Sequence, residues 1–404
     1  MSTRIAFTEQ ALPAWKRAVL KVGSSLLAGD GGLSPRNARH LAAFVEACHA
    51  QGRELVIVSS GAVAAGRAIL HATLHATPRP GAAMAERQAL AALGQAKLMA
   101  FWQGFFAKPV AQVLLTHDDV RNRRRYLNAQ ATLRELLRCG ALPIVNENDT
   151  VSVDELKLGD NDMLGAIVAA LIDADVLFIA TDIDGLYDAD PRTHPTAKPI
   201  QAATDPGDEI LAMAGGAGSG VGTGGMRTKI LAAQRAGAAG IDTVLFNGTR
   251  TEVSAALALD RLSGTRLIAG RSRVAARKHW LRHAPVERGA AILIDAGAAI
   301  ALIDKGASLL PIGVADAQGE FRRGDLVEIV LVESMLVESI RTDGDRTRSV
   351  ARGVTQYSAA DIRRIARRKS QEIESILGYN YGDTIVHRDD LSLHASHSNE
   401  AADV

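Results

Sequence analysis

The first two thirds of the chain alternate short, apolar, β-branched segments with longer segments of helical periodicity. Strands that are apolar along their whole length are covered on both faces, and intervening helices connect parallel neighbours. The pattern therefore predicts an α/β fold, with an open, mostly parallel sheet sandwiched by helices. The apolar segments are RAVLKVG (17–23), ELVIVSSG (54–61), KPVAQVLL (108–115), ALPIVNEN (141–148), DVLFIATD (175–182) and GIDTVLFNG (240–248).

Composition narrows the class of protein. At 404 residues the chain is long enough for two or three domains. A net charge of +1 gives no overall field that would attract nucleic acid or an anionic membrane. The two cysteines have no metal-binding spacing. The N-terminus lacks a signal peptide and no apolar run reaches the length of a membrane span, so we expect a cytoplasmic protein.

The sequence changes character near residue 260, where a basic and poorly periodic segment begins. We expect a catalytic α/β domain and, after a linker, a small β-rich domain with a C-terminal helix and a disordered tail. That helix is predicted as one element between an N-cap at Ser358 and Gly378. A TDG sequence at 342–344 predicts a hairpin turn. The expected boundaries are 1–270 for the catalytic domain, 271–285 for the linker, 286–391 for the β-rich domain and 392–404 for the tail.

Polar residues follow the carboxyl ends of the predicted strands, where open α/β sheets form their ligand crevice. Lys21 ends the first strand, and because a simply buried lysine is costly we expect its ammonium group to face an anion. Ser60 precedes a predicted helix, whose N-terminus favours anions. Carboxylates and amides crowd together in 146–150 and 159–162, where they can orient lysines or hold a substrate ammonium group.

The glycine-rich stretch GVGTGGMRTK (220–229) fits neither the P-loop nor the dinucleotide-binding spacing. Its backbone can still wrap a polyphosphate, and the helix predicted after it presents its N-terminus to the anion. A flexible linker is the alternative, and Lys229 at the end of the stretch argues against it. Lys21 and Lys229 could thus bracket a migrating phosphoryl group. For Thr181 and Asp182 we expect nucleotide contact rather than metal ligation.

Taken in order, six motifs resemble those of the amino acid kinase superfamily, and within it those of the glutamate 5-kinase family, over residues 15–270. The C-terminal section, with ILIDAGAAIALIDKGASLLPIGV and FRRGDLVEI, resembles the PUA domain appended to bacterial members. The resemblance implies ATP-dependent phosphorylation of the side-chain carboxylate of L-glutamate to L-glutamyl 5-phosphate, the first step of proline biosynthesis. It also implies Mg²⁺, whose protein ligands it does not name. The motifs are LKVGSS, VSSGA, NENDTVS, KLGDNDMLGA, TDIDGLYDADP and GTGGMRTK.

The resemblance also implies roles for individual residues. Lys21 and Lys229 stabilise the charge of the transferred phosphoryl group, and Asp162 orients both lysines. L-Glutamate is held by Ser60, Asp149 and Asn161. ATP is held by residues from three loops: Lys21, Thr181, Asp182, Thr223, Gly224, Gly225, Met226, Arg227, Thr228 and Lys229.

Other interpretations remain open from the residues. A kinase of the same superfamily could act on N-acetylglutamate, aspartate, carbamate or UMP. An RNA-binding protein is a second alternative, because PUA domains commonly bind RNA and residues 363–369 are basic. Acidic neighbours and the near-zero net charge argue against it, so we expect no RNA partner. A third alternative is a regulator that has lost activity, and the presence of both lysines and of the acidic loops argues against it. The resemblance further implies a homo-oligomer, dimer or tetramer, and coupling to glutamyl phosphate reductase; we expect no membrane partner.

Overall fold

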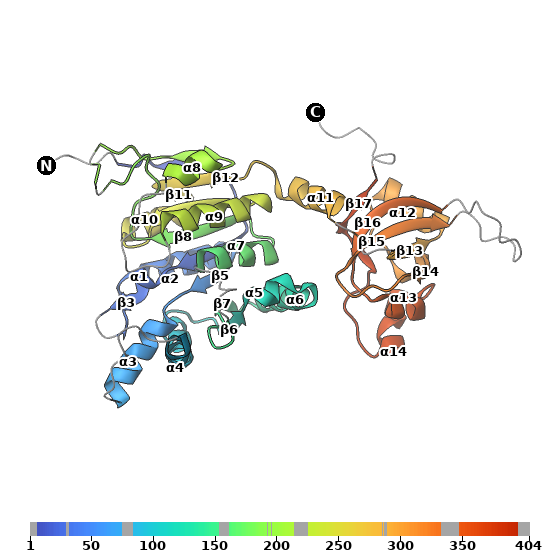
Figure 1. Ribbon diagram of the computed structural model, residues 1–404, viewed down its shortest axis with the longest axis horizontal. Helices are drawn as coiled ribbons and strands as arrows, with labels where there is room; N and C mark the ends of the chain where they lie inside the picture. Colours follow the sequence, from blue (N-terminus) through green and yellow to red (C-terminus); the bar gives the residue numbers. More distant parts are fainter. Residues whose placement is uncertain are drawn as a thin grey trace, which may run out of the picture. The chain divides into compact units, whose positions relative to one another are not determined.

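The computed structural model divides the chain into two compact units, unit 1 (Met1–Arg273) and unit 2 (Val274–Val404), each described here by itself (Figure 1). Thr223, Gly224, the predicted turn at 342–344 and residues 395–404 of the predicted tail lie outside the described residues. No helix among the described residues is long and apolar enough to cross a membrane. The structure describes residues 6–29, 32–74, 84–152, 161–191, 193–194, 196–213, 225–284, 286, 289–332 and 347–394.

Unit 1 contains an eight-stranded sheet in the order β6-β7-β5-β2-β8-β10-β12-β9. Each of the six predicted apolar segments contains one of its strands, and neighbours from β6 to β10 run parallel. Only β12 pairs antiparallel, with β10, so the predicted mostly parallel sheet is confirmed. The strands are β2 (Arg17–Val22), β5 (Glu54–Ser59), β6 (Val110–Leu115), β7 (Leu142–Glu147), β8 (Val176–Thr181), β9 (Ala202–Thr204), β10 (Asp242–Asn247) and β12 (Gly264–Ile268).

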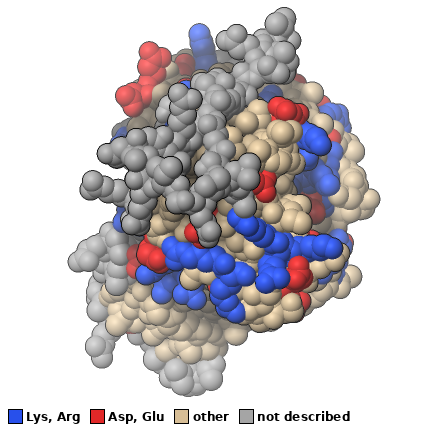
Figure 2. Space-filling model, turned by 90° about the vertical axis from the view of Figure 1, so that its right-hand side faces the viewer, with Lys and Arg blue, Asp and Glu red and all other residues tan. Residues whose placement is uncertain are grey.

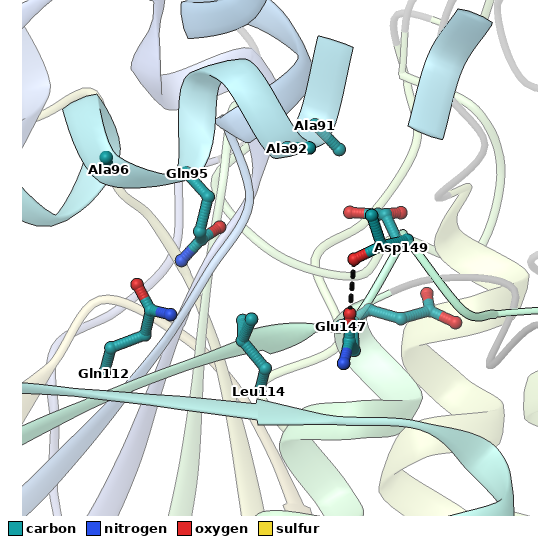
Figure 3. A pocket seen from close by; sticks show the side chains of 10 residues that line it. Ala91, Ala92, Gln95, Ala96, Gln112, Leu114, Glu147 and Asp149 are labelled. Atoms are coloured by element: carbon teal, nitrogen blue, oxygen red, sulfur yellow. Dashed lines mark hydrogen bonds between the residues drawn. The ribbon is translucent and has the colours of Figure 1, made fainter. Parts of the chain in front are cut away.

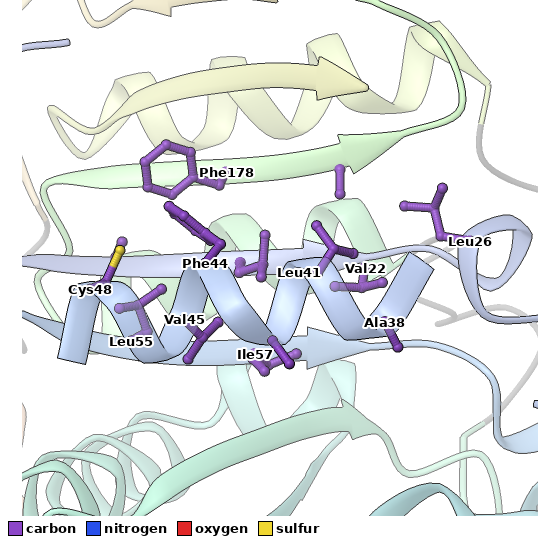
Figure 4. Close-up of a cluster of buried hydrophobic side chains, with 14 of the residues drawn as sticks. Val22, Leu26, Ala38, Leu41, Phe44, Val45, Cys48, Leu55, Ile57 and Phe178 are labelled. Atoms are coloured by element: carbon purple, nitrogen blue, oxygen red, sulfur yellow. The ribbon is translucent and has the colours of Figure 1, made fainter. Parts of the chain in front are cut away.

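Helices cover both faces of this sheet and form two hydrophobic cores. On one face, α2 (Pro35–Ala50) packs against β2, β5 and β8, and Phe44 meets Phe178 edge-on at 5.5 Å between ring centroids (Figure 4). On the other face, α7 (Asn161–Leu171) and α9 (Met226–Ala238) contribute aliphatic side chains. The aliphatic composition suits this arrangement, because branched side chains fill both faces of a buried sheet.

The remaining elements of unit 1 surround this sheet. Helices α3 and α4 pack so closely that a Cβ on Gly94 would lie 1.9 Å from the Ala62 carbonyl oxygen. Arg53 and Asp260 form an ion pair of 2.6 Å beside Trp15. The other bounds are β1 (Gln10–Ala11), α1 (Ser24–Leu27), β3 (Ala28–Gly29), β4 (Gly32–Leu33), α3 (Ala62–Leu74), α4 (Met84–Gln103), α5 (His117–Arg121), α6 (Arg123–Arg138), α8 (Asp208–Met213), α10 (Thr251–Leu257) and β11 (Arg261–Leu262).

Unit 2 is built on a five-stranded sheet in the order β14-β13-β15-β16-β17, which confirms the predicted β-rich domain. Its first helix, α11 (Arg273–His283), occupies most of the range predicted as a linker. The other elements are β13 (Ala291–Ile294), α12 (Ala296–Lys305), η2 (Pro311–Gly313), β14 (Val314–Gln318), β15 (Leu326–Val332), β16 (Thr347–Thr355), α13 (Ala359–Ile365), η3 (Ser370–Glu372), α14 (Ile373–Leu377) and β17 (Val386–Leu393).

The predicted single helix from Ser358 to Gly378 is wrong, although both of its ends are right. Ser358 and Asp361 form a capping box, and Gly378 ends α14 with a φ of 85°. Between them α13 ends at Ile365, and Arg367, two residues later, has a φ of 62° and donates its N–H to two carbonyl oxygens of the η2 region. These tertiary hydrogen bonds replace the helical ones. Strand β17 also continues through Leu393, two residues into the predicted tail, because it pairs with β16.

Candidate active site

A buried carboxylate joins the two predicted lysines of unit 1. Asp162 Oδ1 lies 2.6 Å from Lys21 Nζ, and Asp162 Oδ2 lies 2.9 Å from Lys229 Nζ. The Thr228 hydroxyl donates to the same Oδ2 at 3.2 Å. The Asp162 side chain is fully buried, and the two lysine side chains are only 4% and 9% exposed. Because burial of an isolated charge is costly, these three groups depend on one another.

The fold brings this trio together from three separate elements. Lys21 lies on β2 between β5 and β8, on the face that its neighbour Val19 shares with α7. Asp162 lies in the first turn of α7, where the helix dipole stabilises a negative charge. Lys229 lies in the first turns of α9. A Cβ on Gly23 would lie 3.3 Å from Lys21 Nζ, so glycine there avoids crowding the ammonium group.

A chain of amide hydrogen bonds continues from the trio. Asn161, next to Asp162, donates through Nδ2 to Ser60 Oγ at 2.6 Å and to Asn146 Oδ1 at 3.1 Å. Asn146 Nδ2 in turn donates to Gln95 Oε1 at 3.1 Å. Two of the three predicted substrate residues, Ser60 and Asn161, therefore touch. Asn146 lay in a loop singled out in the sequence but was not assigned a role, and Gln95 gave no signal because it sits among alanines in a helix.

The third predicted substrate residue, Asp149, lines a pocket of about 310 Å³ between α4, β6 and the end of β7 (Figure 3). Gln95 lines the same pocket and so connects it to the amide chain. The Ser152 hydroxyl donates to Glu147 Oε1 at 2.6 Å, which holds the loop after β7. The pocket residues are Ala91, Ala92, Gln95, Ala96, Gln112, Leu114, Glu147, Asn148, Asp149 and Thr150.

The predicted nucleotide residues lie at the ends of β8 and the start of α9. Thr181 is buried and donates to the exposed Asp182 at 3.3 Å. Gly225 is the N-cap of α9, which begins at Met226, and the Thr228 hydroxyl also donates to the Gly225 carbonyl at 2.8 Å. Arg227 is exposed in the first turn of that helix.

The neighbouring strand end adds residues that the sequence did not identify. Asn247, at the end of β10, donates through Nδ2 to Asp184 Oδ1 at 2.8 Å, and Arg250 reaches the same oxygen at 3.4 Å. The FNG sequence at the end of this strand is the local pattern that could have marked Asn247 as a candidate site residue. Across the described ranges, no three His, Cys, Asp or Glu side chains gather as a metal-binding group.

Basic side chains also gather in a band on one face of the molecule, with acidic side chains beside them (Figure 2). In unit 2, Arg363 donates to the Ala317 and Gly319 carbonyl oxygens and pairs with Glu320. Arg364 donates to the Ile376 carbonyl oxygen. Two of the arginines considered for RNA are therefore engaged within the protein. The expectation of no RNA partner stays a prediction.

Comparison with known proteins assigns both units to families. The amino acid kinase family matches residues 16–247, and the PUA domain matches residues 290–377. A glutamate 5-kinase of Xanthomonas campestris pv. campestris (strain 8004) is 70% identical over 92% of this chain and 99% of its own length. Glutamate 5-kinases of Xanthomonas oryzae pv. oryzae (strain KACC10331 / KXO85) and Xylella fastidiosa (strain M12) are 69% and 64% identical, over 93% and 96% of this chain and 100% and 97% of their own. The resemblance seen in the motifs is confirmed: the chain belongs to the amino acid kinase family and, within it, to the glutamate 5-kinases with a C-terminal PUA domain.

Proposed function

We propose that this chain transfers the γ-phosphoryl group of ATP to the side-chain carboxylate of L-glutamate, forming L-glutamyl 5-phosphate in the first step of proline biosynthesis. The observation that carries the proposal is the buried Lys21–Asp162–Lys229 trio at the carboxyl ends of parallel strands. Two ammonium groups held by one carboxylate leave a net charge of +1 facing the site. The high identity to glutamate 5-kinases along almost the whole chain supports the choice of acceptor.

The residues match what phosphoryl transfer to a carboxylate requires. A glutamate side chain has an ordinary pKa near ~4.3, so it is already an ionised nucleophile at neutral pH and needs no general base. The site has to align the nucleophile with the γ-phosphorus and reduce the repulsion between two anions. Lys21 and Lys229 supply positive charge, and Asp162 prevents both ammonium groups from moving away when no ligand is bound.

Ser60, Asn161 and Asp149 are proposed to hold the amino acid. The Asn161 amide nitrogen is committed to Ser60 and Asn146, so its Oδ1 is the atom that remains to accept from a substrate ammonium group. The Asp149 carboxylate adds negative charge at the pocket. Aspartate carries the same groups on a side chain shorter by one methylene. Its side-chain carboxylate should therefore fall short of the lysines, and the enzyme should prefer glutamate.

ATP is proposed to lie along β8 and the N-terminus of α9, in contact with Thr181, Asp182, Thr228 and Lys229. The helix N-terminus offers backbone N–H groups to phosphate oxygens. We propose that Mg²⁺ enters with ATP, held chiefly by phosphate oxygens and water, where it adds further charge neutralisation. A homo-oligomer and coupling to glutamyl phosphate reductase remain proposals by family resemblance.

The acceptor is tested by trapping the acyl phosphate with hydroxylamine in the presence of ATP and Mg²⁺. L-Glutamate, aspartate and N-acetylglutamate are compared, and UMP is followed by ADP release. Hydroxamate from glutamate, at a kcat/KM at least tenfold above that of every other acceptor, is the expected result. Preferential turnover of another acceptor would contradict the proposed substrate, and no turnover of any acceptor would contradict the proposed activity.

A further inference from the structure

The amide groups of Asn161, Asn146 and Gln95 form one chain of hydrogen bonds. Asn161 donates to Asn146 Oδ1, and Asn146 donates to Gln95 Oε1, both at 3.1 Å. An amide oxygen that accepts leaves the nitrogen of the same group as the donor. At the end of the chain, Gln95 therefore uses its oxygen for Asn146 and keeps both N–H groups of Nε2 for another partner.

That nitrogen is buried without a partner. Gln95 Nε2 is inaccessible to solvent and forms no hydrogen bond with any residue in the part of the chain that the structure describes. Buried polar atoms are almost always satisfied, so an exception points to a group that is absent from the ligand-free protein. Figure 3 shows the Gln95 side chain reaching from α4 into the pocket, with Gln112 directed toward it from β6.

The chemistry of the pocket indicates what this partner is. An amide N–H requires an acceptor, and a carboxylate oxygen is the strongest one that a small metabolite offers at neutral pH. The same pocket carries the Glu147 and Asp149 carboxylates, which suit an ammonium group. An α-amino acid presents both groups on adjacent bonds. A phosphate-rich nucleotide would instead meet the negative charge of these two residues.

We propose that Gln95, whose side chain lines the pocket, turns Nε2 toward the α-carboxylate of the amino-acid substrate when it binds and, through Asn146, fixes the orientation of Asn161. The inference rests on the proposed function, because it names a further residue for the same acceptor site. Asn161 adjoins the lysine-bound Asp162, and Gln95 lies two hydrogen bonds further along the amide chain. The contact is therefore with the carboxylate that remains unphosphorylated, at the opposite end of the substrate from the lysines.

The test uses the purified full chain and the Gln95→Glu variant. This near-isosteric change keeps an oxygen that accepts from Asn146 but replaces the free N–H groups with a second anionic oxygen. The KM for L-glutamate is expected to rise roughly 10- to 100-fold, the usual effect of losing a hydrogen bond to a charged group. The KM for ATP should stay unchanged. The melting temperature of Gln95→Glu should fall because its added charge is buried, so the kinetics are measured at a temperature at which the variant is fully folded. Gln95→Leu removes the donor without adding charge and should raise the KM for glutamate in the same direction.

Gln103→Glu is the matched control, because it makes the same amide-to-carboxylate change on the same helix, at an exposed side chain outside the pocket. Its KM for glutamate should stay within about threefold of wild type. An unchanged KM in both Gln95 variants would overturn the role of Gln95, and so would an equal rise in Gln103→Glu, which would assign the effect to any charge added on α4. Failure of the wild-type chain to phosphorylate glutamate would instead contradict the proposed function itself.

Discussion

Replacing Asp162 with asparagine should destabilise unit 1 more than replacing either of its lysine partners. The trio carries a net charge of +1, Asp162→Asn raises this to +2, and Lys229→Met lowers it to zero. Breaking a buried ion pair by removing one partner costs about 3–5 kcal/mol, because the other charge stays buried without its counter-ion. Here Asp162 is fully buried and contacts both ammonium groups within 2.9 Å, so the full range applies. Lys229→Met keeps the Lys21 pair and should cost roughly 1–2 kcal/mol.

Urea unfolding followed by tryptophan fluorescence measures this difference. Trp15 and Trp102 are buried in unit 1, whereas Trp280 belongs to unit 2 and is 47% exposed, so the signal reports chiefly on unit 1. The melting temperature of Asp162→Asn should also fall by roughly 6–20 °C, taking 2–4 °C per kcal/mol for a domain of this size. A free energy of unfolding for Asp162→Asn within about 1 kcal/mol of wild type, or no greater loss than in Lys229→Met, would refute the charge argument.

Three further predictions concern the scaffold. Gly94→Ala should lower the melting temperature of unit 1 by several degrees because its Cβ would lie 1.9 Å from a carbonyl oxygen of α3, whereas Gly104→Ala, whose nearest contact is 3.4 Å, should leave it unchanged. Hydrogen bonding from Arg53 lowers the pKa of Asp260. Asp260→Asn should therefore lose the whole stabilisation at neutral pH, above the ordinary carboxyl pKa, and the difference from wild type should vanish as pH falls through the lowered pKa. Urea unfolding at several pH values measures this difference. Burial raises the pKa of Cys48 to about 12, whereas Cys139 is exposed, so a thiol reagent at pH 8 should modify one thiol in the native protein and two in denaturant; two in the native protein would contradict the burial of Cys48.

The sheet could be predicted because its signal is local. Each of the six apolar segments is a strand because continuous β-branched residues bury well on both faces, and that property is visible without knowing any neighbour. Lys21 could be singled out for the same reason, because a charge at the end of an apolar strand is unusual wherever the strand lies. Its partner Asp162 required the family resemblance, since nothing local links residues 141 positions apart.

Other features depended on tertiary contacts that leave no local pattern. The predicted helix after Ser358 ends at Ile365, where the chain turns so that the Arg367 N–H reaches carbonyl oxygens in the η2 region, although the helical periodicity continues through the break. Gln95 lies in an alanine-rich helix, where a glutamine is normally a solvent-exposed residue. Only its hydrogen bond to Asn146 and the burial of its nitrogen distinguish it.

The account centres on two lysines that flank the transferred phosphoryl group, and a single-turnover measurement of Lys21→Ala and Lys229→Ala tests it most directly. Each variant is mixed with saturating ATP, Mg²⁺ and L-glutamate, and the rate of acyl phosphate formation is compared with wild type after ATP binding has been measured separately. Loss of one charged group that stabilises the transition state should slow the chemical step by about 10²- to 10³-fold in both variants. A chemical rate within a few-fold of wild type in either variant, with ATP bound, would contradict the assignment of that lysine to the reaction.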